Sequence, residues 1–565
     1  MHPEITELVR SLLLKRGIIE DKDIAAFLKP DYDTHTHSPL LLHDIGIAVK
    51  RILQAIDAEE RIAVYADFDC DGIPGASVLS DFFEKIGYAN IEVYLPHRDR
   101  EGYGFHTEAI TELAGRGVKL IITVDVGTAA LDAVLFAKNL GVDVIVTDHH
   151  EILGELPKAV AVLNPKIVPP ASSGIERYPF PHLCGAAMAF KLVQALLIEG
   201  KKQERPEFLA VPEGWEKWLL DLVAIATVAD MVQLIGENRT LVYWGLQVLR
   251  KSPRPGIIAL CNALRLKRSE LSEDDIGFSI APRINAASRM GEPALALLLL
   301  TTKDSDEAES LAAQLEKLNA SRKGVVSGIV REAKKHARER FTKDDEVIVM
   351  GNPEWKPALL GLAANSVMGE RGGIVCLWGR DALGRLKGSC RSDGARSVVE
   401  LFARSGDALI EYGGHEASGG FSVSSERVHT LHEELARVGA SMERVDVSPE
   451  STHDALITLR EVSMSLLKDI SRLAPFGKGN SKPIFRIAGA KIVDTKRFGK
   501  EKNHIEVSLV CASTGRRSRA FDFFRGPDDF STVPSIGLET AMLATVESDA
   551  YRGGLVLRLV DVLPV

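Results

Sequence analysis

Short apolar runs alternate with helix-length amphipathic stretches in the first part of the chain. The helical stretches lie around residues 75–85, 106–116 and 128–140. This alternation is typical of βαβ units, so it predicts an α/β fold with a parallel, doubly wound sheet and helices on both of its faces. The predicted strands are the Val- and Ile-rich runs RIAVYAD (61–67), NIEVYLP (90–96), VKLIITVD (118–125), VDVIVTD (142–148) and AVAVLNP (159–165).

The pattern changes several times along the rest of the chain. Residues 215–250 are helical and mostly apolar, and a long charged helix at about 305–340 is a natural connector to a second α/β unit. Beyond residue 450 the apolar runs are short and alternating, which predicts a small antiparallel barrel. The predicted parts are a helical preface at 1–50, a first α/β domain at 51–250, a helical connector at 251–343, a smaller α/β domain at 344–445 and the barrel at 446–565.

The composition fits a multidomain protein and excludes several classes. A chain of 565 residues is too long for one hydrophobic core. Its 45% hydrophobic and 26% charged residues exclude a disordered or collagen-like chain. No apolar run reaches the roughly 20 residues that a membrane-spanning helix needs, and the first residues lack the layout of a signal peptide. We therefore expect a cytoplasmic protein that does not bind to a membrane.

The spacing of the cysteines and the net charge exclude two kinds of cysteine site and restrict where nucleic acid could bind. The six cysteines lie far apart with no CxxC pair, which excludes a disulfide framework and a zinc ribbon. The net charge is −9. A surface that binds nucleic acid would therefore have to be a local basic patch and not a property of the whole chain.

Acidic and histidine side chains follow three of the predicted strands, at the point where each strand ends. The motif DFDCDG (67–72) follows the first strand, Asp125 ends the third, and the triplet Asp-His-His (148–150) follows the fourth. Because the carboxyl ends of parallel strands meet at one edge of a sheet, five carboxylates and two imidazoles should converge there. An Asp at such a junction can instead cap the next helix, but so many at three strand ends cannot all be caps.

Five converging carboxylates need compensating positive charge. Two carboxylates about 4 Å apart repel each other by roughly 4 kcal/mol at an effective dielectric constant of about 20. Bound divalent cations are the simplest explanation, and the excess of carboxylates over imidazoles favours Mn²⁺ or Mg²⁺ over structural zinc. A pair of such ions would activate a water and hold both oxygens of an in-line displacement at phosphorus. The sequence therefore predicts metal-assisted phosphoester hydrolysis.

The DxDxDG loop and the Asp-His-His triplet resemble the DHH phosphoesterase family, in particular its exonuclease branch. The resemblance extends over nearly the whole chain, because further blocks of that family occur here in the expected order. It implies a DHH domain, a long connecting helix, a smaller α/β DHHA1 domain and a C-terminal OB-like β-barrel. The blocks are PHRDREGYGF (96–105), VADMVQLIGENRTL (228–241), APRINAASRM (281–290), LNASRK (318–323), GSCRS (388–392), GGHEASGGF (413–421) and LAPFGKGN (473–480).

The resemblance also implies roles for individual residues. The catalytic positions are Asp69, Asp71 and His150, and the last matches a group that contacts a metal or protonates the leaving oxygen. The residues that match the metal ligands of the family are Asp67, Asp69, Asp71, Asp125, His149 and Asp230. The positions that face the nucleotide, its terminal 5′-phosphate or the scissile phosphate are Arg98, Arg283, Ser389, Arg391 and His415.

Several positions depart from the family pattern without removing a ligand, among them three that bear on the site. Tyr65 stands where smaller DHH enzymes carry a metal-binding histidine, Ser288 where glycine is usual, and Lys356 where histidine is common. We expect hydrolysis to be kept, with changed details of substrate contact at the last two positions.

The function that the resemblance implies is a 5′→3′ exonuclease that degrades single-stranded DNA with two Mn²⁺ or Mg²⁺ ions, in recombination and repair. One alternative is a phosphodiesterase for short oligoribonucleotides or cyclic dinucleotides, whose relatives usually lack the barrel. Another is a non-catalytic DNA-binding scaffold, whose relatives have lost metal ligands. The resemblance suggests a single-strand-binding protein and a helicase as partners, and we expect a monomer.

Basic residues interleaved with aromatic ones in the predicted barrel are candidates for holding the strand. One cluster is KRFGKEK (496–502), and the other runs from Arg516 to Phe524. Basic residues that follow the phosphates, with aromatic rings on which bases stack, are typical of proteins that bind single strands. A solvated hairpin whose phenylalanines belong to the core is the alternative.

Overall fold

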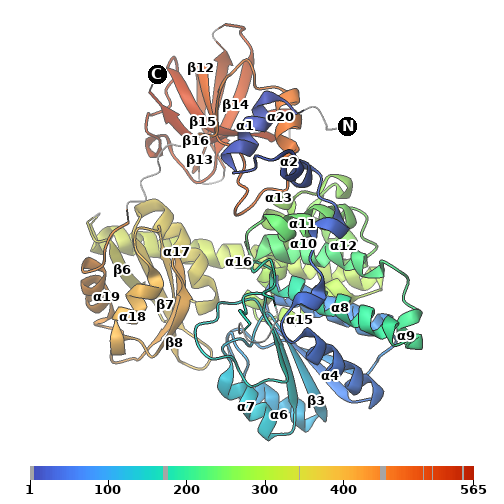
Figure 1. Ribbon diagram of the computed structural model, residues 1–565. Helices are drawn as coiled ribbons and strands as arrows, with labels where there is room; N and C mark the ends of the chain where they lie inside the picture. Colours follow the sequence, from blue (N-terminus) through green and yellow to red (C-terminus); the bar gives the residue numbers. More distant parts are fainter. Residues whose placement is uncertain are drawn as a thin grey trace. The chain divides into compact units, whose positions relative to one another are not determined.

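The chain forms two compact units in the computed structural model, which describes residues 5–169, 176–342, 344–445, 453–499, 502–511, 513–549 and 553–564 (Figure 1). The larger unit comprises His37–Val232 and Trp244–Ser448. The smaller unit comprises Met1–Thr36, Gln233–Tyr243 and Pro449–Val565. Both ends of the chain and a short central segment therefore belong to the same unit.

The larger unit contains the predicted doubly wound sheet. Its strands run parallel in the spatial order β2-β1-β3-β4-β5. The inner strand β1 is buried from Ile62 to Ala66, which explains why its sequence is a continuous apolar run and not an alternating one. This arrangement confirms the predicted α/β fold. The strands are β1 (Arg61–Ala66), β2 (Ile91–Tyr94), β3 (Val118–Val124), β4 (Asp143–Thr147) and β5 (Ala161–Leu163).

Helices cover both faces of this sheet (Figure 1). α6 and α7 share an apolar core with the face that carries Tyr65 and Ile121, and α5 packs on the other face beside α8. A Cβ at Gly75 of α5 would lie 2.5 Å from Val124 Cγ1 and 3.1 Å from Ala186 Cα, so this close approach requires glycine. The helices of this layer are α4 (Ile45–Asp57), α5 (Gly72–Lys85), α6 (Thr107–Gly115), α7 (Leu131–Asn139) and α8 (Gly185–Lys202).

A helical region follows this sheet and leads into the predicted connector, α16 (Ser305–Arg340). This helix begins at Asp304, whose side chain accepts a hydrogen bond from the Glu307 N–H. It buries apolar residues in both halves, such as Leu315 and Ala333, so the connector is not fully solvated. Within the described ranges, no helix is long and apolar enough to cross a membrane. The other elements are η1 (Pro39–Leu41), α9 (Pro206–Leu209), η3 (Trp215–Leu219), α10 (Leu220–Ala229), α11 (Gly236–Leu249), α12 (Pro255–Leu264), η4 (Arg268–Glu270), α13 (Glu273–Asp275), η5 (Ile276–Ile280), α14 (Ala281–Arg289) and α15 (Pro293–Thr301).

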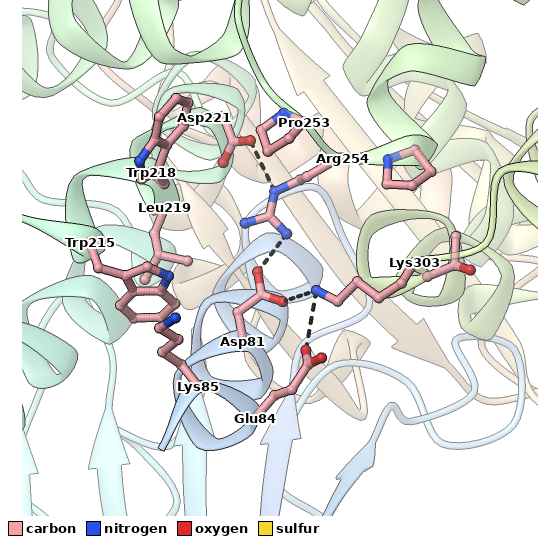
Figure 2. Close-up of a pocket in the computed structure, with 12 residues that line it drawn as sticks. Asp81, Glu84, Lys85, Trp215, Trp218, Leu219, Asp221, Pro253, Arg254 and Lys303 are labelled. Carbon is pink, nitrogen blue, oxygen red and sulfur yellow. Dashed lines mark hydrogen bonds and ion pairs between the residues drawn. The ribbon is translucent and has the colours of Figure 1, made fainter. Parts of the chain in front are cut away.

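A network of charged side chains, of which Asp81 and Asp221 are buried and Arg254 is nearly so, joins α5 and α10 to the start of α12 and the end of α15 (Figure 2). Arg254 Nε lies 2.9 Å from Asp221 Oδ2, and Arg254 Nη1 lies 2.5 Å from Asp81 Oδ2. Lys303 Nζ lies 3.1 Å from Asp81 Oδ1. The network lines a cavity of about 660 Å³ together with Trp215. These charges pair with one another, and Asp81 lies near the opposite end of α5 from the acids at the strand ends. We therefore assign the network a structural role.

A second, smaller α/β sheet follows α16, as predicted. Its strands lie in the order β6-β7-β8-β10-β9, with β6 and β7 parallel and the other neighbours antiparallel. The Gly-rich tract forms the hairpin of β9 and β10, in which a Cβ at Gly414 would lie 2.3 Å from the Ser418 carbonyl oxygen. The elements are β6 (Val347–Gly351), α17 (Pro357–Arg371), β7 (Ile374–Arg380), β8 (Leu386–Ser392), α18 (Val398–Arg404), η6 (Gly406–Ala408), β9 (Glu411–His415), β10 (Ser418–Val423) and α19 (Leu431–Ala440).

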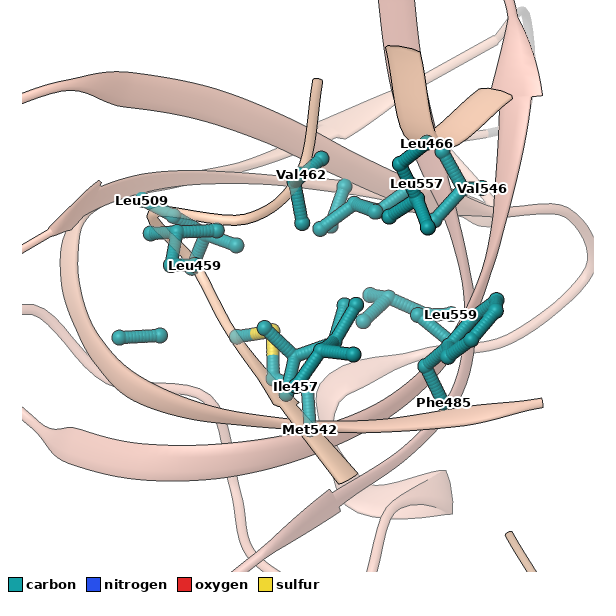
Figure 3. Close-up of a cluster of buried hydrophobic side chains, with 14 of the residues drawn as sticks. Ile457, Leu459, Val462, Leu466, Phe485, Leu509, Met542, Val546, Leu557 and Leu559 are labelled. Carbon is teal, nitrogen blue, oxygen red and sulfur yellow. The ribbon is translucent and has the colours of Figure 1, made fainter. Parts of the chain in front are cut away.

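The smaller unit contains the predicted barrel, with one difference in strand direction. β12 pairs with both β13 and β15, so β12-β13-β14-β16-β15 close a ring around a core that includes Phe485, Leu509 and Met542 (Figure 3). The pair β14–β16 is parallel, which corrects the prediction of an antiparallel barrel, because alternation along a strand does not reveal its neighbour's direction. The elements are β11 (Ala455–Thr458), α20 (Met464–Ser471), β12 (Phe485–Phe498), β13 (His504–Cys511), β14 (Arg517–Asp522), η7 (Pro527–Asp529), β15 (Glu539–Ser548) and β16 (Leu555–Leu563).

The N-terminal helices belong to the barrel unit and do not form a separate preface. Val9 and Leu12 of α1 and Ile24 of α2 are buried in the same apolar cluster as the barrel strands. From residue 37 on, the chain belongs to the larger unit, so the predicted preface of residues 1–50 is divided. Periodic apolar residues predict a buried helix face but do not identify the surface that covers it. The helices are α1 (Glu7–Lys15), α2 (Asp21–Leu28) and α3 (Tyr32–His35).

Arg239 ties the central segment of the chain to the barrel unit. Its side chain is 2% exposed, donates hydrogen bonds to the carbonyl oxygens of Phe27, Ala474 and Pro475, and lies 3.6 Å from the centre of the Phe27 ring. R239M would leave these carbonyls without their donor, at about 1–3 kcal/mol each. We expect it to lower the unfolding midpoint of this unit by at least about 5 °C in scanning calorimetry. The exposed Arg460 supplies the control, and equal midpoints for R239M and R460M would contradict the assignment.

Candidate functional site

The acidic and histidine residues predicted from the strand ends lie together at one edge of the parallel sheet. His149 is central, because its Nε2 lies 3.1 Å from Asp125 Oδ1 and 3.6 Å from both Asp71 Oδ2 and Asp230 Oδ2. Asp71 follows β1, Asp125 follows β3 and His149 follows β4, while Asp230 ends α10. Parallel strands thus bring together side chains that lie far apart in the sequence.

Candidate ligand atoms form three groups among the described residues. In each group, one nitrogen or oxygen atom of every member lies within 4.8 Å of the others. Asp125 and His149 each belong to two groups, so the groups are joined. They contain every predicted metal ligand and also His150, in the combinations Asp67–Asp69–Asp125, Asp71–His149–Asp230 and Asp125–His149–His150.

Several of these atoms are buried without a hydrogen bond, which suits them to bind metal ions. Asp67 Oδ1, Asp125 Oδ1 and His149 Nε2 form no hydrogen bond with the described residues. Burial and repulsion between carboxylates raise the pKa of Asp71 to about 6 and that of Asp230 to about 8. Burial lowers the pKa of His149 to about 3, so its imidazole is neutral. Crowded carboxylates beside a neutral imidazole are a donor set that fits Mn²⁺ or Mg²⁺.

The first turn of α8 fixes the carboxylate of Asp71. The backbone N–H groups of Gly185 and Ala186 donate to its two oxygens at 2.6 and 2.7 Å. Gly185 also makes room for Asp125, because a Cβ there would lie 2.6 Å from Asp125 Cβ. Asp125 has a φ of +63°, which costs energy for a residue other than glycine and is typical of functional sites.

Asp148 differs from the other acids of the site, and the strand-end pattern alone did not separate it from them. Its Oδ1 accepts the His149 N–H at 2.7 Å and lies 2.7 Å from His150 Nδ1, and its Oδ2 accepts the Thr128 N–H at 2.8 Å. Asp148 therefore orients the histidines. Burial opposes the proton on His150, but its hydrogen bond with Asp148 raises the pKa of His150 to about 9. A histidine that is protonated at neutral pH can donate a proton to a leaving group.

Two tyrosines complete the surroundings of these residues. Tyr103 donates to the Asp125 carbonyl oxygen at 3.2 Å, and its Oη lies 3.2 Å from His150 Nδ1. Sequence reasoning missed this residue, although it lies in the block PHRDREGYGF. Tyr65 is buried, its hydroxyl donates to the Gly104 carbonyl oxygen at 2.8 Å, and it belongs to none of the three ligand groups.

Arg283, predicted to face the terminal phosphate, is engaged elsewhere. Its Nε lies 2.8 Å from Glu316 Oε2, and its Nη1 donates to the Ser279 carbonyl oxygen at 3.1 Å. Glu316 compensates the charge of this guanidinium, which makes Arg283 poorly suited to bind an anion.

Arg289, in the same sequence block, interacts electrostatically with Arg98 and Arg391 instead, and its Nη1 donates to the Ala358 carbonyl oxygen of α17 at 2.8 Å. Burial and the charges of Arg98 and Arg322 lower the pKa of Arg289 to about 9, with a further contribution from Arg391. Residues six apart on a helix point in directions about 120° apart around its axis, so the block did not reveal which arginine of α14 faces the site. Crowded guanidinium groups stabilise a bound phosphate, whose charge relieves their repulsion.

The smaller α/β domain contributes the remaining predicted residues. Arg391 Nη1 lies 3.5 Å from Ser389 Oγ, and α17 leaves space for them, because a Cβ at Gly361 would lie 2.5 Å from Arg391 Nη2. His415 ends the exposed strand β9. Burial is the main cause of the lowered pKa of His149, and His415 makes a smaller electrostatic contribution to it.

Models of known protein families match two regions of the chain, one in the first α/β domain and one in the barrel. The model of the DHH family, N-terminal domain, matches residues 61–227, and that of the RecJ OB domain matches residues 453–560. The single-stranded-DNA-specific exonuclease RecJ of Bacillus subtilis (strain 168) is 34% identical over 89% of this chain, which spans 62% of that relative. The protein of the same name from Salmonella typhimurium is 30% identical over 99% of this chain and 96% of its own length.

A solved structure is also similar. The crystal structure of RecJ in complex with Mn²⁺ from Thermus thermophilus has a TM-score of 0.77 at 26% identity, over 99% of this chain and 76% of that chain. The similarity thus extends over the acidic site, the connecting helix, the smaller α/β domain and the barrel. The chain belongs to the RecJ family of single-stranded-DNA-specific exonucleases, whose catalytic domain is of the DHH type.

Proposed function

We propose that this protein is an exonuclease that hydrolyses single-stranded DNA from its 5′ end with two Mn²⁺ or Mg²⁺ ions, in recombination and repair. The observation that carries the proposal is the joined set of ligand groups around Asp125 and His149, which lies beside a cluster of arginines. The ligand groups suit hydrolysis of a phosphodiester, and the arginines suit a terminal phosphate. A relative named single-stranded-DNA-specific exonuclease aligns with 99% of the chain.

The six predicted ligands would hold the ions as two sets. Asp67, Asp69 and Asp125 form one set and Asp71, His149 and Asp230 the other, and Asp125 lies next to both. When bound, such ions lower the pKa of a coordinated water and stabilise negative charge on the phosphodiester. The N–H groups of α8 keep Asp71 oriented for this task, and burial keeps water away from the unpartnered oxygens.

His150 would protonate the leaving oxygen of the scissile bond. Its hydrogen bond with Asp148 fixes the ring and keeps it protonated, and its side chain is 36% exposed, so substrate can reach it. His415 lies within electrostatic reach of this site, where it would contact the scissile phosphate.

The arginine cluster explains why digestion would start at the 5′ end. Arg98, Arg289 and Arg391 would hold a terminal 5′-phosphate, with the Ser389 hydroxyl as a further donor. A strand anchored in this way presents the next phosphodiester to the metal ligands. Release of one nucleotide creates a new 5′-phosphate, so each cycle would end with the group that begins the next.

The outer face of the barrel carries an aromatic cluster suited to stack bases. Phe523 lies 5.9 Å from Phe498 and 5.1 Å from Phe521 between ring centres, and the Arg558 guanidinium lies 4.4 Å from the Phe523 ring. Phe523 is 41% exposed and Phe524 is 78% exposed, so these two rings do not belong to the core. Exposed rings beside guanidinium groups are typical of single-strand-binding surfaces.

Two of the basic residues predicted beside these rings are paired with acids. Lys496 Nζ lies 2.8 Å from Glu506 Oε1, and Arg519 forms ion pairs with Glu506 and Asp549. Lys500, predicted in the first cluster, lies outside the described residues. Both clusters keep exposed basic residues, namely Arg497, Lys502, Arg516 and Arg517, so charge and stacking are both expected to contribute at this face.

F524A tests the stacking surface. A lost base contact of about 1–3 kcal/mol corresponds to an affinity for single strands that is roughly 5- to 150-fold lower. Fluorescence anisotropy with a labelled oligothymidine and Ca²⁺ in place of the catalytic metal would measure it. V533A, at an exposed position of the same unit, is the control, and equal affinities for the two variants would contradict the assignment.

We also propose that the protein acts as a cytoplasmic monomer together with a single-strand-binding protein and a helicase. The family resemblance supports these partners, and so does the substrate, because a helicase generates single strands from a duplex. Light scattering coupled to size exclusion, with and without each partner, tests both statements.

The activity itself is tested on a single strand with a 5′-phosphate and a label at its 3′ end, in Mn²⁺. We expect a ladder that shortens from the 5′ end, is absent on a blunt duplex and stops when EDTA removes the metal. Cleavage of a dinucleotide alone would instead identify a phosphodiesterase of short substrates. Binding without any cleavage would identify a DNA-binding scaffold.

A further inference from the structure

Phe68 lies between two predicted metal ligands and contacts the arginine cluster. Its ring is 3% exposed, and its centre lies 4.9 Å from the guanidinium carbon of Arg98. This distance is within the range of a cation–π contact. The ring thus connects the DFDCDG loop of the metal site with the first arginine of the proposed phosphate site.

Arg98 has few other contacts that could place it. In the described part of the chain its guanidinium forms no hydrogen bond or ion pair, in contrast to Arg283 with its Glu316 partner. The like charges of Arg289 and Arg391 repel it, whereas the carboxylate of Asp67 attracts it. Coulomb forces alone would therefore draw Arg98 away from the cluster and onto the Asp67 carboxylate.

The loop that carries Phe68 is itself fixed from both sides. The Asp67 N–H donates to the Val124 carbonyl oxygen at 3.1 Å, and the Cys70 N–H donates to Asn285 Oδ1 of α14 at 3.0 Å. Because the backbone on both sides of Phe68 is held by hydrogen bonds and the ring is buried, the ring is fixed in position and orientation. Arg98, on a loop of the larger unit between β2 and α6, can stack on that face without using any of its N–H donors.

We propose that Phe68 is a positioning residue that holds Arg98 in the arginine cluster and off the Asp67 carboxylate. Because of this contact, the N–H donors of Arg98 remain available to bind the phosphate. The Asp67 oxygens likewise remain available to bind a metal ion. Selection of a 5′-phosphorylated end and assembly of the metal site are thereby coupled through one ring. This inference rests on the proposed function, because it assigns Arg98 to the terminal phosphate.

The test compares F68L, which keeps the apolar volume but removes the π face, with F68Y, which keeps both. The readout is the ratio of kcat/KM on a 5′-phosphorylated strand to that on a 5′-hydroxyl strand, so a general loss of activity cancels. We expect F68L to lower this ratio about 3- to 30-fold, mainly through KM, and F68Y to restore it. A ratio unchanged in F68L, or lowered equally in both variants, would overturn the proposal.

A double-mutant cycle with R98A separates positioning from packing. If Phe68 acts through Arg98, F68L changes the ratio in the wild-type background but not in the R98A background. Equal effects in both backgrounds would assign the loss to packing and overturn the proposal. Absence of any cleavage by the wild-type protein would instead contradict the proposed function, so the two failures are distinguishable. If F68L does not fold, F68M supplies the same comparison.

Discussion

Replacing Asp125 with alanine is expected to reduce hydrolysis of single-stranded DNA by on the order of 10³-fold or more. Asp125 is the acid shared between two ligand groups, and its Oδ1 is buried without a hydrogen-bond partner. Its loss removes a ligand from the set with Asp67 and Asp69, and also the oxygen that lies 3.1 Å from His149 of the other set. The loss should appear in kcat at saturating Mn²⁺, measured as release of mononucleotides from a 3′-labelled strand.

Two controls make this result specific to the metal site. The first is D132A, at an exposed position in the first turn of α7, which should keep wild-type turnover. The second is the affinity of D125A for single strands, which should largely persist because the barrel face lies in the other unit. Near-normal turnover of D125A would contradict the two-metal assignment, and lost DNA binding would indicate misfolding instead.

Replacing Arg289 with glutamine is expected to lower the preference for a 5′-phosphorylated end by about 10- to 100-fold. A charge-assisted hydrogen bond to phosphate is worth about 1.5–3 kcal/mol, and Arg289 lies within the electrostatic reach of Arg98 and Arg391. The measurement is the ratio of kcat/KM values for 5′-phosphorylated and 5′-hydroxyl strands.

R283Q is the matched variant, because Arg283 lies on the same helix but pairs with Glu316. We expect it to lower the thermal unfolding midpoint while leaving the end preference close to that of the wild type. If R283Q loses the preference and R289Q keeps it, the assignment made from the sequence is right and the one made from the geometry is wrong.

The regular elements of the first domain could be predicted because local pattern and burial agree there. The five strands lie within the predicted runs, and α16 spans the predicted residues 305–340. Asp67, Asp125 and His149 could be brought together from sequence as well, because parallel strands place their carboxyl ends at one edge. The surface that packs against each helix could not be predicted in the same way. The apolar pattern of α1, for example, did not reveal that the barrel covers it.

Side-chain roles within the site were harder to predict than their location. Asp148 and Asp125 both follow a strand, but only the fold shows that the hydrogen bonds of Asp148 are with the histidine loop. Arg283 and Arg289 share one block, but the orientation of α14 decides which of them meets Arg98. Each choice depends on three-dimensional contacts between segments, which spacing along the chain does not contain.

Anomalous diffraction at the manganese absorption edge, from crystals grown with Mn²⁺, tests the two-metal site most directly. We expect two anomalous peaks about 3.5–4 Å apart, one beside Asp67 and Asp69 and the other beside Asp71 and Asp230, with Asp125 next to both. Crystals of D125A should lose at least one peak. A single peak outside these residues, or none at saturating Mn²⁺, would contradict the two-metal site and with it the proposed mechanism.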